Sequence, residues 1–293
     1  MEVIHADRNK NFIVSRSSVS NWSVTKRRYI MDKALRNELL EIFPWVDNKG
    51  DFLSFDDIYQ TVKASPGPYR DMGPRNLAGS GRPEVAGRKE EMFRKITNSL
   101  MECLNKYCTD QKTFDDWHKE TCLWLATELE SLCNKGITVK PGKAQKLINM
   151  TLKHIFCFDS AEEAALNGTF QFCHVPVDQY LLSWFYREVK GLGTLSNDKL
   201  KWGHFEYEEY YRIQIEIRNY LADKKRNIDY IDSKGNPLTP FESEFYIWNE
   251  EKLIRITDAF IHELNWDNST KWMKCGTLRT QFQTILAKIE KKQ

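Results

Sequence analysis

The stretch Gly142-Lys-Ala-Gln-Lys-Leu-Ile-Asn-Met150 decides the fold class that this sequence predicts. Pro141 stands directly before it, and proline is favoured in the first turn of a helix because that turn needs no amide donor. Apolar residues then recur at helical spacing, at Leu147, Ile148, Leu152 and Ile155. We therefore expect a helix that begins near residue 141.

A second informative stretch is His174-Val-Pro-Val-Asp178. Pro176 restrains the chain just ahead of Asp178, and apolar residues follow at helical spacing, at Leu181, Leu182 and Phe185. An aspartate in this position is a favoured N-cap, because its carboxylate accepts hydrogen bonds from free amides of the first turn. We expect Asp178 to open a helix that ends near Gly191.

The same periodicity recurs along most of the chain. It predicts further helices over 26–43, 55–62, 92–107, 113–132, 205–221, 242–248, 251–264 and 276–291. Short strands are possible at 3–4, 12–14 and 228–231. The sequence therefore predicts a mainly α, multi-helix globular fold with a hairpin-like pair of helices, either without strands or with a minor β element.

Four regions follow from this pattern. They are an N-terminal helical segment (1–63), a loop or linker (64–91), a central helical domain with the hairpin-like motif (92–190), and a C-terminal helical region that packs on the rest (191–293). Region 64–91 holds five of the fourteen glycines and four of the nine prolines, so we expect no regular secondary structure there. It is either a surface linker or a basic loop that contacts phosphates through Arg70, Arg75 and Arg82.

Composition narrows the class of protein. A chain of 293 residues with 41% hydrophobic and 29% charged residues can bury a sizeable core and is globular. The net charge of +2 means that any nucleic-acid contact needs a local basic patch. Seven cysteines without a CxxC pair, and no signal peptide, predict free thiols in the cytoplasm. No stretch approaches the roughly 18 apolar residues of a membrane span, so we expect no membrane partner.

Lys146 and Asp178 are the candidate catalytic residues. The free amides at a helix start attract anions, so Gly142 and Lys143 are candidates for binding a nucleic-acid phosphate. The stem of Lys146 is expected near the core, where desolvation favours a nucleophilic amine. Each residue also has a simpler explanation, in which Asp178 is a helix cap and Lys146 a solvated charge.

At these residues the chain resembles the helix-hairpin-helix DNA glycosylase superfamily. The resemblance covers residues 117–190 and rests on the order helix, Gly loop, Lys-x-x-Asn, helix, then Val-Pro-Val-Asp-x-x-Leu. It implies that Gly142 matches the first glycine of the hairpin, Lys146 the lysine of the bifunctional members, and Asp178 the catalytic aspartate. Asn149 matches the small polar position after the lysine.

This resemblance implies a DNA-processing enzyme that excises a modified or damaged base from DNA, its expected partner. The base would be flipped into a pocket and stacked on aromatic side chains, for which Tyr180, Trp184 and Trp202 are candidates. Asp178 would stabilise the positive charge that develops on the sugar, and Lys146 would form a Schiff base with it. No cofactor is expected. The alternative is a non-catalytic helical scaffold that binds nucleic acid or protein.

Other candidate residues have ordinary explanations. His154, Cys157, Cys173 and His174 are of zinc-ligand type, but the adjacent pair at 173–174 fits one tetrahedral site poorly, so we predict no metal. His118 follows Trp117 on an amphipathic helix and is expected to pack in the core. The sequence contains no Walker loop, Rossmann glycine fingerprint, Gly-x-Ser-x-Gly elbow or HExxH motif.

Overall fold

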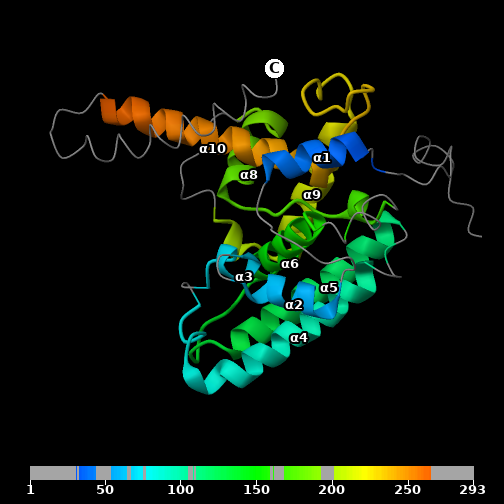
Figure 1. Ribbon diagram of the computed structural model, residues 1–293. Helices are drawn as coiled ribbons and strands as arrows, with labels where there is room; N and C mark the ends of the chain where they lie inside the picture. Colours follow the sequence, from blue (N-terminus) through cyan, green and yellow to red (C-terminus); the bar gives the residue numbers. More distant parts are fainter. Residues whose placement is uncertain are drawn as a thin grey trace, which may run out of the picture.

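The computed structural model describes residues 31, 33–43, 54–64, 67–74, 77–104, 108, 110–158, 161, 168–192 and 201–264, with side chains to 255. Helices dominate these ranges (Figure 1). In chain order they are α1 (Lys33–Ile42), α2 (Phe55–Lys63), α3 (Pro68–Asp71), η2 (Pro83–Val85), α4 (Ala86–Glu102), α5 (Gln111–Ser131), α6 (Pro141–Phe156), η5 (Thr169–Phe172), α8 (Gln179–Trp184), η6 (Phe185–Val189), η8 (Trp202–His204), α9 (Tyr207–Ala222) and α10 (Pro240–Leu264). The predicted mainly α class is confirmed.

Two predictions of secondary structure are wrong. The strand expected at 228–231 is absent, and the described ranges contain only an isolated antiparallel bridge between Ile231 and Pro237. The two helices expected at 242–248 and 251–264 are one continuous helix, α10. The possible strands at 3–4 and 12–14, and the helix at 276–291, lie outside the described residues.

The segment rich in glycine and proline is more regular than its composition indicates. Pro68 and Pro83 stand in the first turns of α3 and η2, where a missing amide donor costs nothing. Gly73 and Gly79 have positive φ and allow the turns between these short helices. The prediction of no regular secondary structure over 64–91 is therefore wrong, because Pro68 and Pro83 begin helices there and α4 already starts at Ala86.

Helix α6 lies in the middle of the molecule (Figure 1). Every one of its residues is buried except Lys143, and α2, α3, α5, η8 and α9 all contact it. A helix that is buried all round is usually apolar, yet α6 carries Gln145, Lys146, Asn149 and Lys153. Because a buried polar group is costly without a partner, the surrounding elements must supply one for each of these side chains.

Candidate functional site

The structure brings Lys146 and Asp178 into direct contact. The Nζ atom of Lys146 lies 2.8 Å from Oδ2 of Asp178, although 31 residues separate the two in the chain. The residues are 4% and 8% exposed. The pair is therefore a buried ion pair that joins α6 to the start of α8.

Asp178 is also the N-cap of α8, as the sequence predicts. Its Oδ1 accepts hydrogen bonds from the amides of Tyr180, at 2.8 Å, and Leu181, at 3.0 Å. Burial would raise the pKa of the Asp178 carboxyl, but Lys146 and the two amides outweigh burial and lower this pKa. Both carboxylate oxygens are therefore engaged by protein donors in the described state.

The first turn of α6 is packed against the chain at 202–205. The amide of Gly142 donates to the carbonyl oxygen of Phe205 at 3.0 Å. A Cβ added at Gly142 would lie only 2.1 Å from the carbonyl oxygen of Trp202, so this close approach requires glycine. The glycine that the resemblance assigns to a DNA phosphate thus serves an internal contact in this structure.

Lys143 is also engaged within the protein. Its Nζ donates to the carbonyl oxygen of Met72 at 3.0 Å and lies 4.8 Å from the centre of the Trp202 ring. Burial lowers the pKa of Lys143. For Lys143 to bind a phosphate, it would first have to leave these two contacts.

The predicted arginines differ in their surroundings. Arg70 is exposed at the end of α3. Arg82 donates to the carbonyl oxygen of Gly79 at 3.0 Å and pairs with Glu84 at 3.6 Å. Arg75 lies outside the described residues.

One predicted stacking residue has to be withdrawn. Trp184 is 0% exposed, and its indole nitrogen donates to the hydroxyl of Tyr230 at 2.9 Å, so it offers no face to a base. Tyr180 is half-buried and already contacts Trp248, with the Arg255 guanidinium 4.6 Å from the centre of its ring. Trp202 is also half-buried. Tyr180 and Trp202 thus keep some accessible surface.

A buried polar network lies beside the ion pair, and the sequence interpretation missed it. It connects Asp115 and His118 on α5, Gln145 and Asn149 on α6, His174 before α8, and Tyr207, Tyr210 and Arg218 on α9. Spacings of three or four residues within α5 and α6 place each pair on one helix face. That spacing of polar residues within apolar helices was the available signal, but it does not identify the partners.

Among the α5 and α6 residues of the network, each hydrogen bond has one donor and one acceptor that can be assigned. Asn149 Oδ1 can only accept, so His118 Nε2, 3.0 Å away, carries a proton and donates to it. His118 Nδ1 is then the acceptor for the hydroxyl of Tyr207 at 3.1 Å. The amide nitrogen of Asn149 donates to the hydroxyl of Tyr210 and to Gln145 Oε1, at 2.9 and 3.0 Å.

The same direction continues to a carboxylate. Tyr210 donates to His174 Nδ1 at 2.8 Å, and His174 Nε2 donates to Asp115 Oδ1 at 2.7 Å. Arg218 holds Asp115 with two hydrogen bonds, of 2.9 and 2.7 Å. Burial alone would raise the pKa of Asp115, but the His174 and Arg218 hydrogen bonds hold it well below its usual range. The network therefore ends at an ionised Asp115.

Gln145 connects this network to the candidate pair. Its Oε1 accepts from the amide of Val177 at 3.1 Å, and its Nε2 donates to the carbonyl oxygen of Val177 at 2.8 Å. Val177 directly precedes Asp178, and Gln145 directly precedes Lys146. The Gln145 side chain thus holds the backbone just before Asp178 against α6. Gln145 is therefore a positioning residue for the ion pair.

We expect the protein to lose stability in mild acid. Burial, opposed by the Asp115 hydrogen bond, lowers the pKa of His174 from 6.5 to about 4. The folded state therefore binds fewer protons than the unfolded chain between these values, and stability falls as pH drops from about 6.5 towards 4. For His174 alone, the lowering of the pKa from 6.5 to about 4 corresponds to a loss of unfolding free energy that approaches about 3 kcal/mol, because one pKa unit is worth ~1.4 kcal/mol.

Urea unfolding measured from pH 7.5 to 4.5 checks this expectation. The fully buried His118 has its pKa lowered by burial as well, so its contribution has the same sign. A midpoint that stays constant over this range would contradict the assignment of His174 as neutral.

The zinc-type residues do not form a metal site. Both ring nitrogens of His174 are hydrogen-bonded, to Tyr210 and Asp115. The Nε2 atom of His154 lies 3.9 Å from Oδ2 of Asp71. Cys157 and Cys173 are buried free thiols. Within the described ranges no group of three or more His, Cys, Asp and Glu residues is arranged to hold a metal ion.

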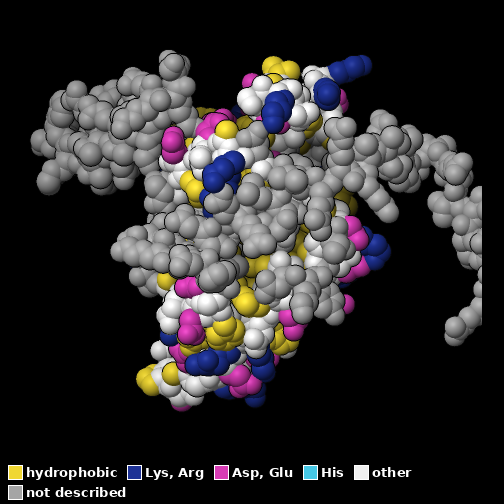
Figure 2. Space-filling model, turned by 45° about the vertical axis from the view of Figure 1, so that its right-hand side comes forward, with side chains coloured by type: hydrophobic (Ala, Val, Ile, Leu, Met, Phe, Trp, Pro, Cys, Tyr) yellow, Lys and Arg dark blue, Asp and Glu magenta, His cyan; other side chains and the backbone are white. Residues whose placement is uncertain are grey.

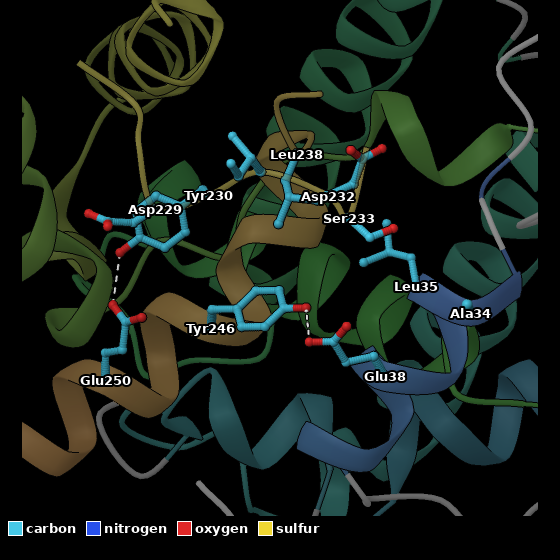
Figure 3. A pocket seen from close by; sticks show the side chains of 11 residues that line it. Ala34, Leu35, Glu38, Asp229, Tyr230, Asp232, Ser233, Leu238, Tyr246 and Glu250 are labelled. Atoms are coloured by element: carbon cyan, nitrogen blue, oxygen red, sulfur yellow. Dashed lines mark hydrogen bonds between the residues drawn. The ribbon is translucent and has the colours of Figure 1, made fainter. Parts of the chain in front are cut away.

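A surface pocket of about 320 Å³ lies between α1, the 229–238 turn and α10 (Figure 3). Four carboxylates line it, those of Glu38, Asp229, Asp232 and Glu250. Tyr246 donates to Glu38 and Tyr230 to Glu250, both at 2.8 Å (Figure 3). Its lining does not include Lys146 or Asp178, and its negative charge opposes phosphate binding.

The exposed charges are mixed. On the face shown in Figure 2, Lys and Arg side chains stand among Asp and Glu side chains over the described surface. None of the helices in the described ranges is long and apolar enough to cross a membrane.

In comparisons with known proteins, no family model, curated protein or solved structure matches the chain.

Proposed function

We propose that the protein is a DNA-processing enzyme of the glycosylase type, with Lys146 and Asp178 at its reaction centre. The observation that supports this most directly is their 2.8 Å contact at the N-cap of α8. The lysine of the hairpin-like helix and the aspartate of the Val-Pro-Val-Asp turn meet where one sugar carbon could contact both. Chemistry that uses two residues on one substrate atom needs this proximity.

The proposed roles follow from the two functional groups. As the bond between base and sugar breaks, positive charge develops on the sugar, and the Asp178 carboxylate stabilises it. The Lys146 ammonium passes one proton to the departing base, and its neutral amine then forms a bond to the same sugar carbon. A second proton moves from nitrogen to the ring oxygen as the sugar ring opens, which leaves a protonated Schiff base.

Burial of the pair sets a condition on this proposal. Lys146 is 4% exposed and its ammonium donates to Asp178, so the ion pair must open when a flipped nucleotide enters. The first turn of α6 meets the 202–205 segment through Gly142 and Lys143. We propose that movement of this segment admits the nucleotide, with Trp202 then free to stack on the base.

Borohydride trapping tests the lysine role. The wild-type protein is incubated with duplexes that carry damaged or modified bases or an abasic site, sodium borohydride is added, and the adduct is located by peptide mass spectrometry. The proposal predicts a covalent adduct on Lys146. Trapping on exposed lysines such as Lys119, or no trapping together with no release of free base, would refute it.

The second candidate function is a non-catalytic helical scaffold that binds protein or nucleic acid. One observation favours it, because every hydrogen-bonding oxygen of Asp178 is already engaged, as in a structural cap and ion pair. Asp178→Asn separates the two functions. Asparagine retains the cap, so a folded Asp178→Asn protein should lose base release if the enzyme proposal is right.

A further inference from the structure

We propose that Cys103 and Cys108 are a reversible disulfide site, oxidised by a low-molecular-weight disulfide such as oxidised glutathione. Their sulfur atoms lie 2.8 Å apart. A disulfide bond is about 2.05 Å long, so the two sulfurs need to approach by about 0.8 Å to bond. The proposal is independent of the function proposed for Lys146 and Asp178.

The position of the pair favours bond formation. Cys103 directly follows α4, and Cys108 lies just before α5, so the two sulfurs meet at the connection between these helices. Both residues are buried, at 1% and 8% exposure. Because the two sulfur atoms already lie 2.8 Å apart in the folded protein, bond formation needs an approach of only about 0.8 Å.

The reaction can be written as two thiol–disulfide exchanges. The Cys108 thiolate, the more exposed of the two, attacks one sulfur of glutathione disulfide and releases one glutathione thiolate. Cys103 then loses its proton, attacks the Cys108 sulfur and releases the second glutathione thiolate. The two protein thiols together lose two electrons, which reduce glutathione disulfide to two glutathione molecules. The two protons released by the protein thiols are taken up, through solvent, by the two glutathione thiolates.

Three of the other described cysteines have different neighbours. Cys133 donates to the carbonyl oxygen of Leu129 at 3.2 Å, Cys157 to that of Lys153 at 3.3 Å, and Cys122 lies 3.6 Å from His118 Nδ1. Cys173 is 2% exposed and interacts with Cys108, and burial raises the pKa of its thiol well above the ordinary value, as it does for Cys103. Among the described cysteines the 2.8 Å sulfur–sulfur contact joins Cys103 to Cys108, so oxidation is expected to be selective for this pair.

Thiol counting on the intact protein tests the proposal. The reduced chain contains seven cysteines, and thiol titration after denaturation should find seven before oxidation and five after incubation with glutathione disulfide. Non-reducing peptide mapping should show a Cys103–Cys108 link, and dithiothreitol should restore seven thiols. A count that stays at seven, or a link from Cys108 to Cys173, would overturn it.

A resolving-cysteine variant distinguishes this site from general thiol reactivity. In Cys103→Ser the second exchange is impossible, so glutathione should remain attached to Cys108. Cys133→Ser is the matched control, because Cys133 is 7% exposed and serine can keep its hydrogen bond to Leu129. This control should still form the 103–108 link, and a control that fails to do so would count against selective oxidation.

Discussion

Replacing Lys153 by methionine is expected to lower the free energy of unfolding by about 3–5 kcal/mol. Lys153 pairs with Glu244 across α6 and α10, and both side chains are 2% exposed. The aromatic rings of Phe43 and Phe245 also surround the ammonium, at 4.2 and 4.5 Å. Methionine fits the stem of the lysine but leaves the Glu244 carboxylate buried without its partner, and that desolvated charge is the main cost.

Urea unfolding of the single and double variants measures this effect. Lys153→Met combined with Glu244→Gln removes both charges, so it should recover a large part of the loss. Lys112→Met is the control, because Lys112 pairs with Asp116 in solvent, where such pairs contribute little. If Lys153→Met and Lys112→Met unfold at the same urea concentration, the buried Lys153–Glu244 pair does not contribute the expected free energy.

The second large effect is expected at the candidate pair itself. Lys146→Met should also lower the free energy of unfolding by about 3–5 kcal/mol, since it leaves the Asp178 carboxylate buried without a counter-charge. Asp178→Ala should lose the cap as well, which adds about 1 kcal/mol. Asp178→Asn should cost less than Asp178→Ala, because asparagine can still accept from the amides of Tyr180 and Leu181, although it leaves the Lys146 ammonium without its counter-charge.

A double-mutant cycle separates the ion pair from the cap. Lys146→Met and Asp178→Asn are measured singly and together by urea unfolding, and their coupling reports the interaction between the two side chains. We expect a clear coupling, with the double variant more stable than the sum of the single losses indicates. Additive losses would mean that the two side chains do not stabilise each other in solution, despite the 2.8 Å contact.

The sequence predicts helix starts and caps correctly where residues within a single turn determine them. Pro141 begins α6, and Asp178 caps α8, because a missing donor and a nearby carboxylate act within a single turn. The 64–91 segment was misjudged for the opposite reason. Proline disrupts a helix interior but is favourable at a helix start, and composition does not reveal which position it takes.

The candidate site was predicted only in part. Lys146 and Asp178 are paired in the sequence prediction because each stands at an expected helix start, and the family resemblance supports this pairing; the structure places them in contact. The partners of His118 and His174 could not be predicted, because they come from other helices; the two on α9 stand about 90 and 36 residues further along the chain. Periodicity identifies the buried face of a helix, whereas contacts over such separations depend on how the helices pack.

The amino-acid sequence alone determines a mainly α protein, the start of α6, the cap of α8 and the low net charge. The tertiary structure decides that α6 is buried on all sides, so that its lysines, amides and hydroxyls must each find an internal partner. It also decides that Gly142 contacts the chain at Trp202 and that Trp184 lies in the core. The physical reason is that helix propensity is local, while the desolvation of a polar side chain depends on every element packed around it.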